Sequence, residues 1–526
     1  MSTVTKTLPE KTSSLRSLAL DLVALSPTQR GREGSSPAGA DSPGQSHTPS
    51  TPYPSNCLNF LRTLEGRHNG EDEEEAVPGL TCLDILVVGA GLGGLATAVA
   101  LARKGHRVTV LEQATQLSEV GAGIQIPPNS SKLLRRWGVM GIMSEKAVRP
   151  DGISFMRWQD GQKIGFTDLS ERFIELCGAP YYVAHRAHLH SALYERALAL
   201  GVEVRLNSRV IRYDRSSPAA TVVGGHTFGA DLIVAADGVK SVARNLVHSG
   251  EGQGPKYTGF AVYRATVDVE KMRRIPEISW LLEKPGLRVW IGEDRHVMTY
   301  TIAAGESFNM VLSHRDHRDP SAWQCRSQQE MLEDMRAEFA GWDQQLTKII
   351  DLIDSTIKWP LMAGEPLQNW VADSSRLVIL GDAAHPMLPY MSQGAAMAVE
   401  DGAALAVAIS SITSCSQLGT ALEVFQRERK QRTSMMQEAS LVNAFLWHFK
   451  DGPEQRARDA AMRPEVEGKS FTSSPNQWSD PVTQTWAYGY DAEGVMLERV
   501  EMRSCDGDDG SVSLEVYEIV DPYFEK

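Results

Sequence analysis

The sequence has few cysteines, and none of them is paired in a recognisable motif. Six cysteines are spread along 526 residues without a CxxC pair: Cys57, Cys82, Cys177, Cys325, Cys415 and Cys505. Zinc ligands come in closely spaced pairs, and disulfide frameworks occur in short chains that are dense in cysteine. The pattern therefore argues against a zinc site and a disulfide framework, and it fits a reducing compartment.

Positive charge is also in short supply. The 53 lysines and arginines are outnumbered by 66 aspartates and glutamates, which gives a formal net charge of -13. Nucleic acids and anionic membranes bind broad basic surfaces. We therefore expect no nucleic-acid partner, and an anionic substrate would have to be attracted by local charges.

A long uninterrupted apolar run is missing too. The best candidate for a membrane span, Leu83 to Ala102, contains four glycines and Asp84, which favour a strand, a turn and a helix instead. The N-terminus shows no secretory signal. We expect no membrane span and a cytoplasmic protein; the alternative is a mitochondrial presequence in "KTSSLRSLALDLVALSPTQRGR".

Composition divides the chain into five segments. A stretch rich in Ser, Pro and Gly cannot bury enough apolar surface to fold, so 1–80 is predicted to be a disordered low-complexity extension. Strands alternate with helices over 81–254, and this pattern returns over 371–410, which predicts two parts of one α/β domain. The segment 255–370 is β-rich and is predicted as an inserted domain, and 411–526 as a helical region with an irregular tail.

The first motif with a chemical meaning is Gly89-Ala90-Gly91-Leu92-Gly93-Gly94. It follows the apolar run "LDILVV" and precedes an Ala-rich helix, and the next predicted strand, "RVTVL", ends on Glu112. Glycines at Gly89, Gly91 and Gly94 permit a tight turn and a close approach to a pyrophosphate, while a terminal acid can bind ribose hydroxyls. The motif predicts dinucleotide binding, either of NAD or of FAD.

Two further strand ends repeat this plan. The run "ADLIVAA" ends on Asp237-Gly238 and enters a helix that carries Arg244, and "RLVIL" ends on Gly381-Asp382 before a Pro-rich loop and another helix. The carboxyl ends of parallel strands meet at one edge of a sheet, where α/β folds bind their ligands. We therefore expect these three strand ends to lie close together.

Taken in this order, the three motifs resemble those of the aromatic-ring hydroxylases of the para-hydroxybenzoate hydroxylase class, which are single-component FAD monooxygenases. The resemblance extends from about Leu83 to Ala492. The stretches "GAGIQIPPNSSKLLRRWGV", "TGFAVYRATV" and "GDAAHPMLPYMSQGAAMAVEDGAALA" are similar to the salicylate hydroxylase branch, and the N-terminal tail and "WAYGYDA" look fungal.

This resemblance implies a Rossmann-like FAD-binding domain over 81–254 and 371–410, with an inserted antiparallel β-sheet substrate domain over 255–370. It implies bound FAD, transient NAD(P)H, and O₂ that hydroxylates an electron-rich small aromatic substrate through a flavin hydroperoxide. The alternatives are a tailoring monooxygenase of fungal secondary metabolism that acts on a polyketide phenol or an indole, a flavin dehydrogenase or reductase, and a non-catalytic flavin-binding protein. The substrate, the choice of NADH or NADPH, an accompanying decarboxylation and the oligomeric state stay open.

The family pattern also assigns residues to the cofactor. In relatives, an aspartate at the position of Asp382 binds the ribityl chain, and the backbone after Gly394 meets the flavin ring. The cofactor-binding residues implied in this way, in addition to the Gly-rich loop and Glu112, are Ala122, Gly123, Arg186, Asp237, Asp382, Gly394 and Ala395.

On the substrate side the resemblance points to Tyr263, Arg244 and Gln393. A tyrosine at the position of Tyr263 favours the substrate phenolate in relatives, although a tyrosine in a strand is also a common packing residue. Arg244 either binds a substrate anion, as in fungal relatives, or pairs with an acid at a helix surface, and Gln393 is expected to border the pocket. Gly259 stands where a bacterial relative carries a pocket histidine, which leaves the ring position attacked open.

Overall fold

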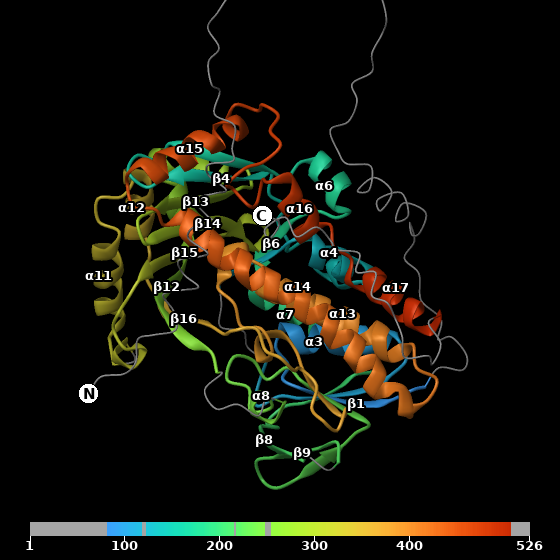
Figure 1. Ribbon diagram of the computed structural model, residues 1–526. Coiled ribbons are helices and arrows are strands. Elements are labelled where there is room, and N and C mark those ends of the chain that lie inside the picture. The colour runs from blue at the N-terminus through green and yellow to red at the C-terminus, as the bar shows by residue number, and fades with distance from the viewer. Residues whose placement is uncertain (1–80, 118–121, 215–216, 248–253, 324, 506–526) are drawn as a thin grey trace, which may run out of the picture. The chain divides into compact units, whose positions relative to one another are not determined.

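The structure is a computed structural model that describes residues 81–117, 122–214, 217–247, 254–323 and 325–505 (Figure 1). The predicted extension over 1–80 lies outside the described residues. Two large sheets and a set of C-terminal helices make up the described part of the chain.

A five-stranded parallel sheet carries the three strand-end motifs. Its strands are, in spatial order, β17 (Leu377–Ile379), β11 (Leu232–Ala235), β1 (Asp84–Val88), β2 (Arg107–Leu111) and β7 (Glu203–Arg205). The strands β17, β11 and β1 are immediate neighbours and all run in the same direction. The ends of β11 and β17, at Ala235 and Ile379, are paired directly, so the motifs that follow them emerge side by side, as the sequence predicted.

Helices cover one face of this sheet and a small antiparallel sheet lies against the other (Figure 1). The helices are α3 (Leu92–Arg103), α4 (Pro128–Arg136), α5 (Val139–Ile142), α7 (Arg186–Ala199) and α13 (Gly394–Ser410). The small sheet consists of β8 (Val210–Tyr213), β9 (Ala219–Val222) and β10 (Thr227–Gly229). A two-stranded ribbon of β3 (Gly123–Ile126) and β6 (Tyr182–His185) and the short helix α8 (Arg244–Val247) complete this part.

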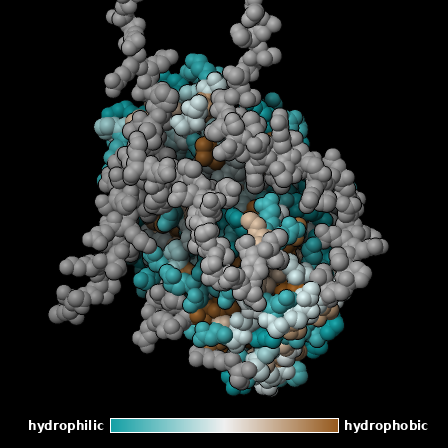
Figure 2. Space-filling view, turned by 45° about the vertical axis from the view of Figure 1, so that its right-hand side comes forward, coloured by the Kyte–Doolittle hydropathy of each residue, from teal (hydrophilic) through white to brown (hydrophobic). Residues whose placement is uncertain are grey.

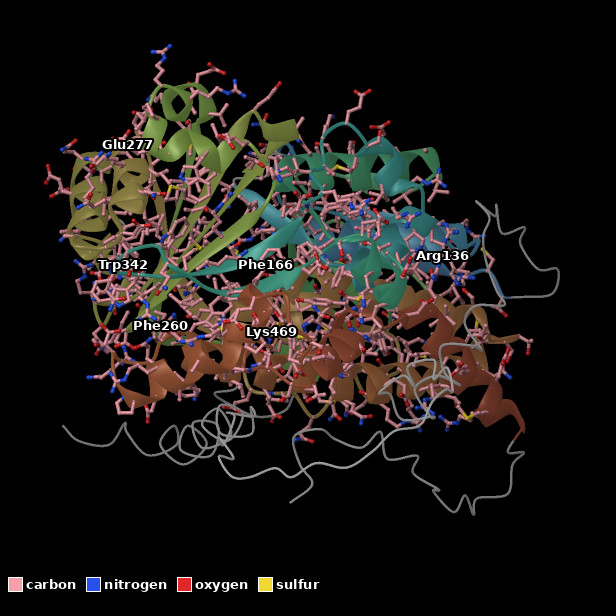
Figure 3. The ribbon with its side chains drawn as sticks, turned by 90° about the horizontal axis from the view of Figure 1, so that it is seen from above. Arg136, Phe166, Phe260, Glu277, Trp342 and Lys469 are labelled. Atoms are coloured by element: carbon pink, nitrogen blue, oxygen red, sulfur yellow. The ribbon has the colours of Figure 1, made fainter. Side chains whose placement is uncertain are left out.

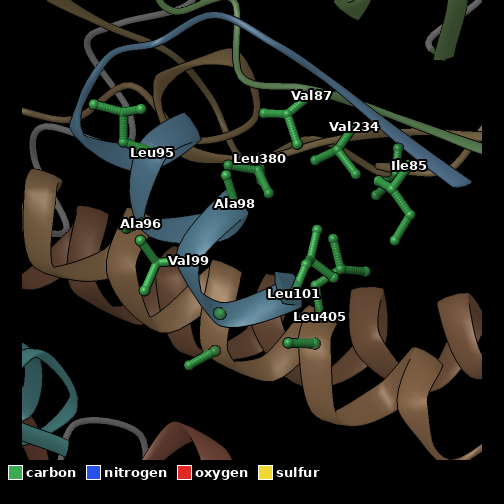
Figure 4. Packing of buried hydrophobic residues seen from close by; sticks show 14 of the residues in the cluster. Ile85, Val87, Leu95, Ala96, Ala98, Val99, Leu101, Val234, Leu380 and Leu405 are labelled. Carbon is green, nitrogen blue, oxygen red and sulfur yellow. The ribbon is translucent and has the colours of Figure 1, made fainter. Parts of the chain in front are cut away.

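Close packing around α3 explains its alanine- and glycine-rich sequence. Ala98 of α3 and Leu380 lie toward Val87 of β1 and Val234 of β11, and Leu405 of α13 lies beside Leu101 of α3 (Figure 4). A Cβ atom on Gly402 would lie 2.8 Å from the Thr97 backbone. Small residues therefore allow α3 and α13 to approach each other closely, which places the start of α13 beside the Gly-rich loop.

The second sheet has seven strands and is antiparallel except for one parallel pair, β13 with β4. Its strands are, in spatial order, β16 (Ile357–Ala363), β12 (Lys256–Asp268), β15 (Ser307–Arg315), β14 (Arg295–Ile302), β13 (Leu287–Gly292), β4 (Gly152–Arg157) and β5 (Lys163–Asp168). Strands β4 and β5 come from a part of the chain that precedes β7 and β11 of the parallel sheet. The two sheets are thus interleaved along the sequence.

Both faces of the seven-stranded sheet are covered. One face packs under helices α9 (Val269–Arg273), α10 (Pro276–Ser279), α11 (Gln328–Glu338) and α12 (Gln344–Asp351). The helix α11 begins with a capping box between Ser327 and Glu330. The other face meets the loop over 386–391 and the C-terminal helices.

The C-terminal region is helical. It contains α14 (Leu418–Trp447), α15 (Pro453–Val466), α16 (Pro481–Tyr488) and α17 (Ala492–Cys505), and α6 (Glu171–Cys177) lies against α16. The first half of α14 packs on the core of the parallel sheet and its second half on the core of the seven-stranded sheet (Figure 1). This single long helix therefore fixes one sheet relative to the other.

These features confirm the predicted fold class, an α/β domain with a second, mainly antiparallel sheet and a helical C-terminal region. None of the helices among the described residues is long and apolar enough to cross a membrane. The described atoms on the face shown in Figure 2 are mainly hydrophilic, with separate hydrophobic patches.

Candidate active site

The Gly-rich loop after β1 accepts no larger side chains at two of its three motif positions. Gly89 has a φ of 104°, and a Cβ atom on it would lie 2.4 Å from the Ala236 carbonyl oxygen. A Cβ atom on Gly94 would lie 1.9 Å from the Gly89 carbonyl oxygen, whereas one on Gly91 would meet nothing within 4 Å. The loop is therefore packed tightly on its protein side and open at Gly91, where α3 begins and its free N–H groups favour a phosphate.

Glu112 lies beside this loop, as predicted. Its carboxylate accepts hydrogen bonds from the backbone N–H groups of Ala90 at 2.7 Å and Ala114 at 2.8 Å. The imidazole of His190 on α7 also contacts the Ala90 carbonyl oxygen at 2.7 Å. Glu112 thus holds the loop while it stands at the strand end where a ribose is expected.

The two carboxylate oxygens of Asp237 differ in their hydrogen bonding. One carboxylate oxygen, Oδ2, accepts from the backbone N–H of Val242 at 2.9 Å and from the Tyr213 hydroxyl at 3.3 Å. Burial, reinforced by the Asp237 carboxylate, raises the pKa of the Tyr213 phenol. The other oxygen, Oδ1, is buried and has no hydrogen-bond partner among the described residues. A buried acceptor without a donor is expensive, and a ligand hydroxyl would satisfy it.

Arg244 is buried and contacts main-chain carbonyl oxygens of two loops. It is 4% exposed, and its guanidinium donates to the carbonyl oxygens of Ala383 and Asp382, both at 2.7 Å, and of Val239 at 2.9 Å. Its donors are therefore used to tie the loop after β11 to the loop after β17. These partners are main-chain carbonyl oxygens, whereas the sequence suggested a substrate anion or an acid at a helix surface.

The loop after β17 presents Asp382 to solvent. Gly381 has a φ of 59°, a conformation that suits glycine, and the Asp382 side chain that follows is exposed. Its carboxylate accepts no hydrogen bond from the described residues, and Arg244 contacts only its main-chain oxygen. The carboxylate is thus available to a ligand at the sheet edge.

The helix α13 begins next to this loop with two small residues, Gly394 and Ala395. Gln393 precedes them, is fully buried, and pairs with the side-chain amide of Asn129 at 2.9 Å. Ala395 also lines a small pocket together with Leu92, Ile124 and Leu189. The first N–H groups of α13 have no side-chain cap, so they remain available to a partially negative group.

Gly123, the first residue of β3, lies against the seven-stranded sheet, and Ala122 precedes it. A Cβ atom on Gly123 would lie 2.6 Å from the Tyr300 hydroxyl oxygen, and the Gly123 N–H donates to the Asn309 side chain at 2.6 Å. The N–H of Arg186, the first residue of α7, donates to the Ala122 carbonyl oxygen at 3.1 Å. These residues therefore join the cofactor side of the site to β14 and β15.

Tyr263 lies apart from this group. It is 1% exposed in the core under helices α9 to α12, its ring stacks on His314, and its hydroxyl accepts from Lys358 at 3.1 Å. Lys358 in turn pairs with the buried Asp316 at 2.6 Å. The structure therefore places Tyr263 on the helix-covered face, away from the loops that carry Asp237, Asp382 and Gly394.

The neighbouring residue, Arg264, points the other way because successive strand residues alternate between faces. It pairs with Val311, which packs on the core that contains the loop over 386–391, whereas Tyr263 pairs with Leu312 of the opposite core. Burial, with a smaller effect from nearby Arg186, lowers the pKa of the Arg264 guanidinium, and Tyr300 is close enough to oppose that shift. We call the face with Arg264, Val311 and Tyr300 the site face.

Sequence reasoning missed Arg264, Tyr300 and Asn309 as site residues. Their signal was present: Arg264 is a charge inside an apolar strand run, "FAVYRATV", where only alternate residues can share a face. The sequence could not say which of the two adjacent residues, Tyr263 or Arg264, the site would receive.

The residues present fit FAD. The Gly-rich loop leaves open space at Gly91, the Asp237 Oδ1 atom lacks a donor, and the Asp382 carboxylate is exposed at the same sheet edge. These groups suit a pyrophosphate and the hydroxyls of a ribityl chain, and the start of α13 suits a flavin ring that accepts electrons. Fold and site together define a flavin-binding α/β protein.

Comparisons with known proteins agree with this class. A family model described as an FAD binding domain matches residues 82–440, and the chain therefore belongs to this family. The "FAD-dependent monooxygenase OpS4" of Beauveria bassiana is 37% identical over 415 residues, which is 78% of this chain and 96% of that protein. The "3-hydroxybenzoate 6-hydroxylase 1" of Aquipseudomonas alcaligenes is 34% identical and covers 77% of this chain and 97% of its own length.

Solved structures show the same fold. The crystal structure of CtdE with FAD and a substrate has a TM-score of 0.67 at 25% identity and covers 80% of this chain and all of that one. A salicylate hydroxylase substrate complex has a TM-score of 0.64 at 24% identity, with 80% of this chain and 98% of that chain covered. The resemblance to FAD-dependent aromatic-ring monooxygenases is thereby confirmed, and the chain is an FAD-dependent oxidoreductase.

Proposed function

We propose that this protein is a monooxygenase that uses NAD(P)H and O₂ to hydroxylate an electron-rich aromatic substrate bound on the site face. One observation carries the proposal: the loop that follows Asp382 packs, through Leu388, Tyr390 and Met391, in the same core as Met298 and Tyr300 of the seven-stranded sheet. The segment that presents FAD-binding groups is therefore also the segment that borders the face suited to a substrate.

The cofactor-binding residues are proposed from their positions at the edge of the parallel sheet. We assign FAD to Gly89, Gly91, Gly94, Glu112, Asp237 and Asp382, with the start of α13 at Gly394 and Ala395 beside the ring and with Ala122, Gly123 and Arg186 on its other side. When bound, FAD would take a hydride from NAD(P)H and activate O₂. No second Gly-rich fingerprint follows a strand in the sequence, which supports transient binding of the nicotinamide.

Arg264 is proposed as the residue that attracts the substrate. Its guanidinium is half-buried on the site face and donates no hydrogen bond to the described residues. In a partly buried site a fixed cation stabilises a phenolate or a carboxylate far more than in water, and a phenolate is the electron-rich form that reacts with an electrophilic oxygen. Arg264 would thus supply the local attraction that a chain of net charge -13 needs.

Water is kept from the reacting region by the apolar core around the loop. Leu388, Tyr390 and Met391 are buried there, together with Met298 of β14 and Met397 of α13. Exclusion of water strengthens the interaction between Arg264 and an anion, and it limits side reactions of reactive intermediates with water. Gln393, held by Asn129, is proposed to border this region rather than to transfer protons.

The substrate class has two candidates among the relatives. One relative is a 3-hydroxybenzoate hydroxylase, and a small phenolic acid would match a single cation on the site face. The relatives OpS4 and atnJ are fungal FAD-dependent monooxygenases, which favours a role as a tailoring enzyme on a larger phenol. A flavin reductase without oxygen insertion is the alternative of a different class.

The deciding experiment measures oxygen incorporation. The purified protein would be supplied with FAD, NADH or NADPH and a panel of phenolic acids and polyketide phenols, first for stimulated NAD(P)H oxidation and then for product mass under ¹⁸O₂. A product that gains one ¹⁸O atom supports the monooxygenase. NAD(P)H oxidation that yields only hydrogen peroxide with every substrate would favour a reductase.

A further inference from the structure

A buried ion-pair network stands directly behind the loop that is proposed to meet FAD. Glu400 and Asp401 of α13 are both fully buried, and so is Arg429 of α14. Arg429 donates to Glu400 at 2.7 Å and to Asp401 at 2.8 Å, and Arg432 binds the other oxygen of Glu400 at 3.0 Å. We call these four residues the Glu400–Arg429 network.

The two carboxylates of this network hold opposite ends of the loop. Asp401 Oδ2 accepts from the backbone N–H of Gly381 at 3.0 Å and contacts the His385 Nε2 atom at 2.6 Å. Glu400 Oε1 accepts from the Asn129 side chain at 2.6 Å, and the same amide nitrogen donates to Gln393 at 2.9 Å. Asp401 therefore anchors the beginning of the loop, and Glu400, through Asn129, anchors its end.

Both carboxylates are charged in this position. Burial raises the pKa of Glu400, but Arg432 and Arg429 outweigh it and hold the pKa below its usual range. Burial also raises the pKa of Asp401, but His385 and Arg429 outweigh it and lower this pKa below its usual range. Two carboxylates and two guanidiniums compensate one another, and each has well-aligned partners, which is the condition for burying charges at all.

Stability alone does not account for such a network. A buried ion pair gains little over apolar side chains of the same volume, because the desolvation cost offsets the attraction, although removing one partner is costly. The best-attested use of buried charges is to select one arrangement of the groups around them. Here the groups selected are the two ends of one loop, and that loop carries Asp382 at its start and leads into Gly394 and Ala395.

We propose that the Glu400–Arg429 network is a positioning device that fixes the loop over 381–393 before FAD binds, with Asp401 setting the Gly381–His385 end and Glu400 and Asn129 setting the Gln393 end. The network does not touch the proposed cofactor position; it acts through the backbone of Gly381 and the side chain of Gln393. Its consequence for FAD rests on the proposed function, but its effect on the loop does not.

Hydrogen exchange tests this in protein stripped of FAD. Asp401→Asn should raise exchange of the Gly381–His385 amides about tenfold or more, because a charged hydrogen bond of this kind contributes a tenfold to hundredfold bias. Asn129→Ala keeps every ion pair and removes the side chain that links Glu400 to Gln393. It should raise exchange at 392–395 by a similar factor and leave Gly381 at the wild-type rate.

A matched control separates positioning from general loss of stability. Asp459 of α15 is also a buried aspartate, and it pairs with Arg157 and Arg458 without contacting the loop. Asp459→Asn should leave exchange over 381–393 at the wild-type rate relative to β14. After addition of FAD, Asp401→Asn should weaken its binding and shift the visible flavin spectrum, whereas Asp459→Asn should change neither.

Two results would overturn the proposal. One is wild-type exchange at both ends of the loop in Asp401→Asn and Asn129→Ala. The other is faster exchange across all peptides to the same degree as in Asp459→Asn, which would make the network a general stabiliser. If Asp401→Asn does not fold, Asn129→Ala still decides the Gln393 end. Failure of oxygen incorporation would refute the proposed function without changing these exchange rates.

Discussion

The guanidinium of Arg244 donates a hydrogen bond to the main-chain oxygen of Asp382 at 2.7 Å. Arg244 follows β11 and Asp382 follows β17, so this contact joins the two strand-end loops on which the proposed FAD site depends. Because Arg244 is buried, its bonds replace water for several carbonyl groups at once. Arg244 thus holds the two loops together, and its removal should weaken FAD binding.

Arg244→Met should lower stability and weaken FAD binding without raising the KM of an anionic substrate selectively. The substitution leaves the carbonyl oxygens of Asp382, Ala383 and Val239 without their donor. Each one that stays buried should lower the free energy of unfolding by about 1–3 kcal/mol. Thermal melts and FAD titration of the stripped protein would measure this, with exposed Arg205→Met on β7 as the control. If the variant keeps wild-type stability and only its KM for the anionic substrate rises, Arg244 binds the substrate instead.

Glu112→Ala should reduce FAD affinity about tenfold to hundredfold, the range for one lost charged hydrogen bond. The carboxylate orders Ala90 and Ala114 and stands where a ribose is expected, so both effects act in the same direction. Quenching of FAD fluorescence on titration with stripped protein gives the dissociation constant. Glu203→Ala on the adjacent strand β7 is the control, since its side chain is exposed and pairs with Arg205.

The adjacent residues Tyr263 and Arg264 should respond in opposite ways. Tyr263→Phe removes a hydroxyl on the helix-covered face, so hydroxylation should continue at the wild-type rate. Stability should fall slightly, because Lys358 loses one hydrogen-bond acceptor. Arg264→Met removes the cation on the site face and should lower kcat/KM for an anionic phenol on the order of a hundredfold. Steady-state kinetics and FAD content would be measured for both. Slow hydroxylation in Tyr263→Phe alone would reverse the assignment.

Stability should depend on pH through Glu465. Burial raises the pKa of this carboxyl to about 7, against hydrogen bonds that involve Ser474 and Asn476 and one from the backbone N–H of Phe166 on β5 (Figure 3). The folded state then holds a proton that the unfolded state releases near the ordinary glutamate pKa of 4.5. Between these values the folded state binds more protons, so stability falls as the pH rises.

Glu465→Gln should remove the loss of stability that accompanies rising pH. The free energy of unfolding of the variant, relative to wild type, should be greater at about pH 8 than at about pH 5 by about 2 kcal/mol, from roughly 1.4 kcal/mol per pKa unit. Urea unfolding at the two pH values measures the difference. Glu467→Gln, an exposed glutamate in the same region, should show no such pH dependence, and an equal response in both variants would contradict the assignment to Glu465.

Much of the cofactor side could be predicted from the sequence because it depends on local backbone geometry. Gly89 and Gly94 stand where any Cβ atom would collide with the backbone, and the acids Glu112, Asp237 and Asp382 follow directly on apolar strands. Parallel strands bring their carboxyl ends to one edge, so the order of the motifs was enough to predict that they converge.

The substrate side depended on facts that no local pattern contains. The alternation of strand residues required that Tyr263 and Arg264 face opposite ways, but only the packing of α9 to α12 on one side decided which of them the site received. Nor did the sequence indicate that the guanidinium of Arg244 contacts the carbonyl oxygens of Asp382 and Ala383, more than a hundred residues away.

By itself the sequence determined the fold class, the convergence of the three strand ends and the family, because glycine sterics, apolar runs and terminal acids act within a few residues of one another. Only the tertiary structure decided that β4 and β5 join the seven-stranded sheet, that Arg264 lies on the site face, and that Glu400 and Asp401 hold both ends of the loop over 381–393. These are pairings between residues far apart in the chain, and their partners are selected by the free energy of burying charge and apolar surface together, which is settled only when the whole core has formed.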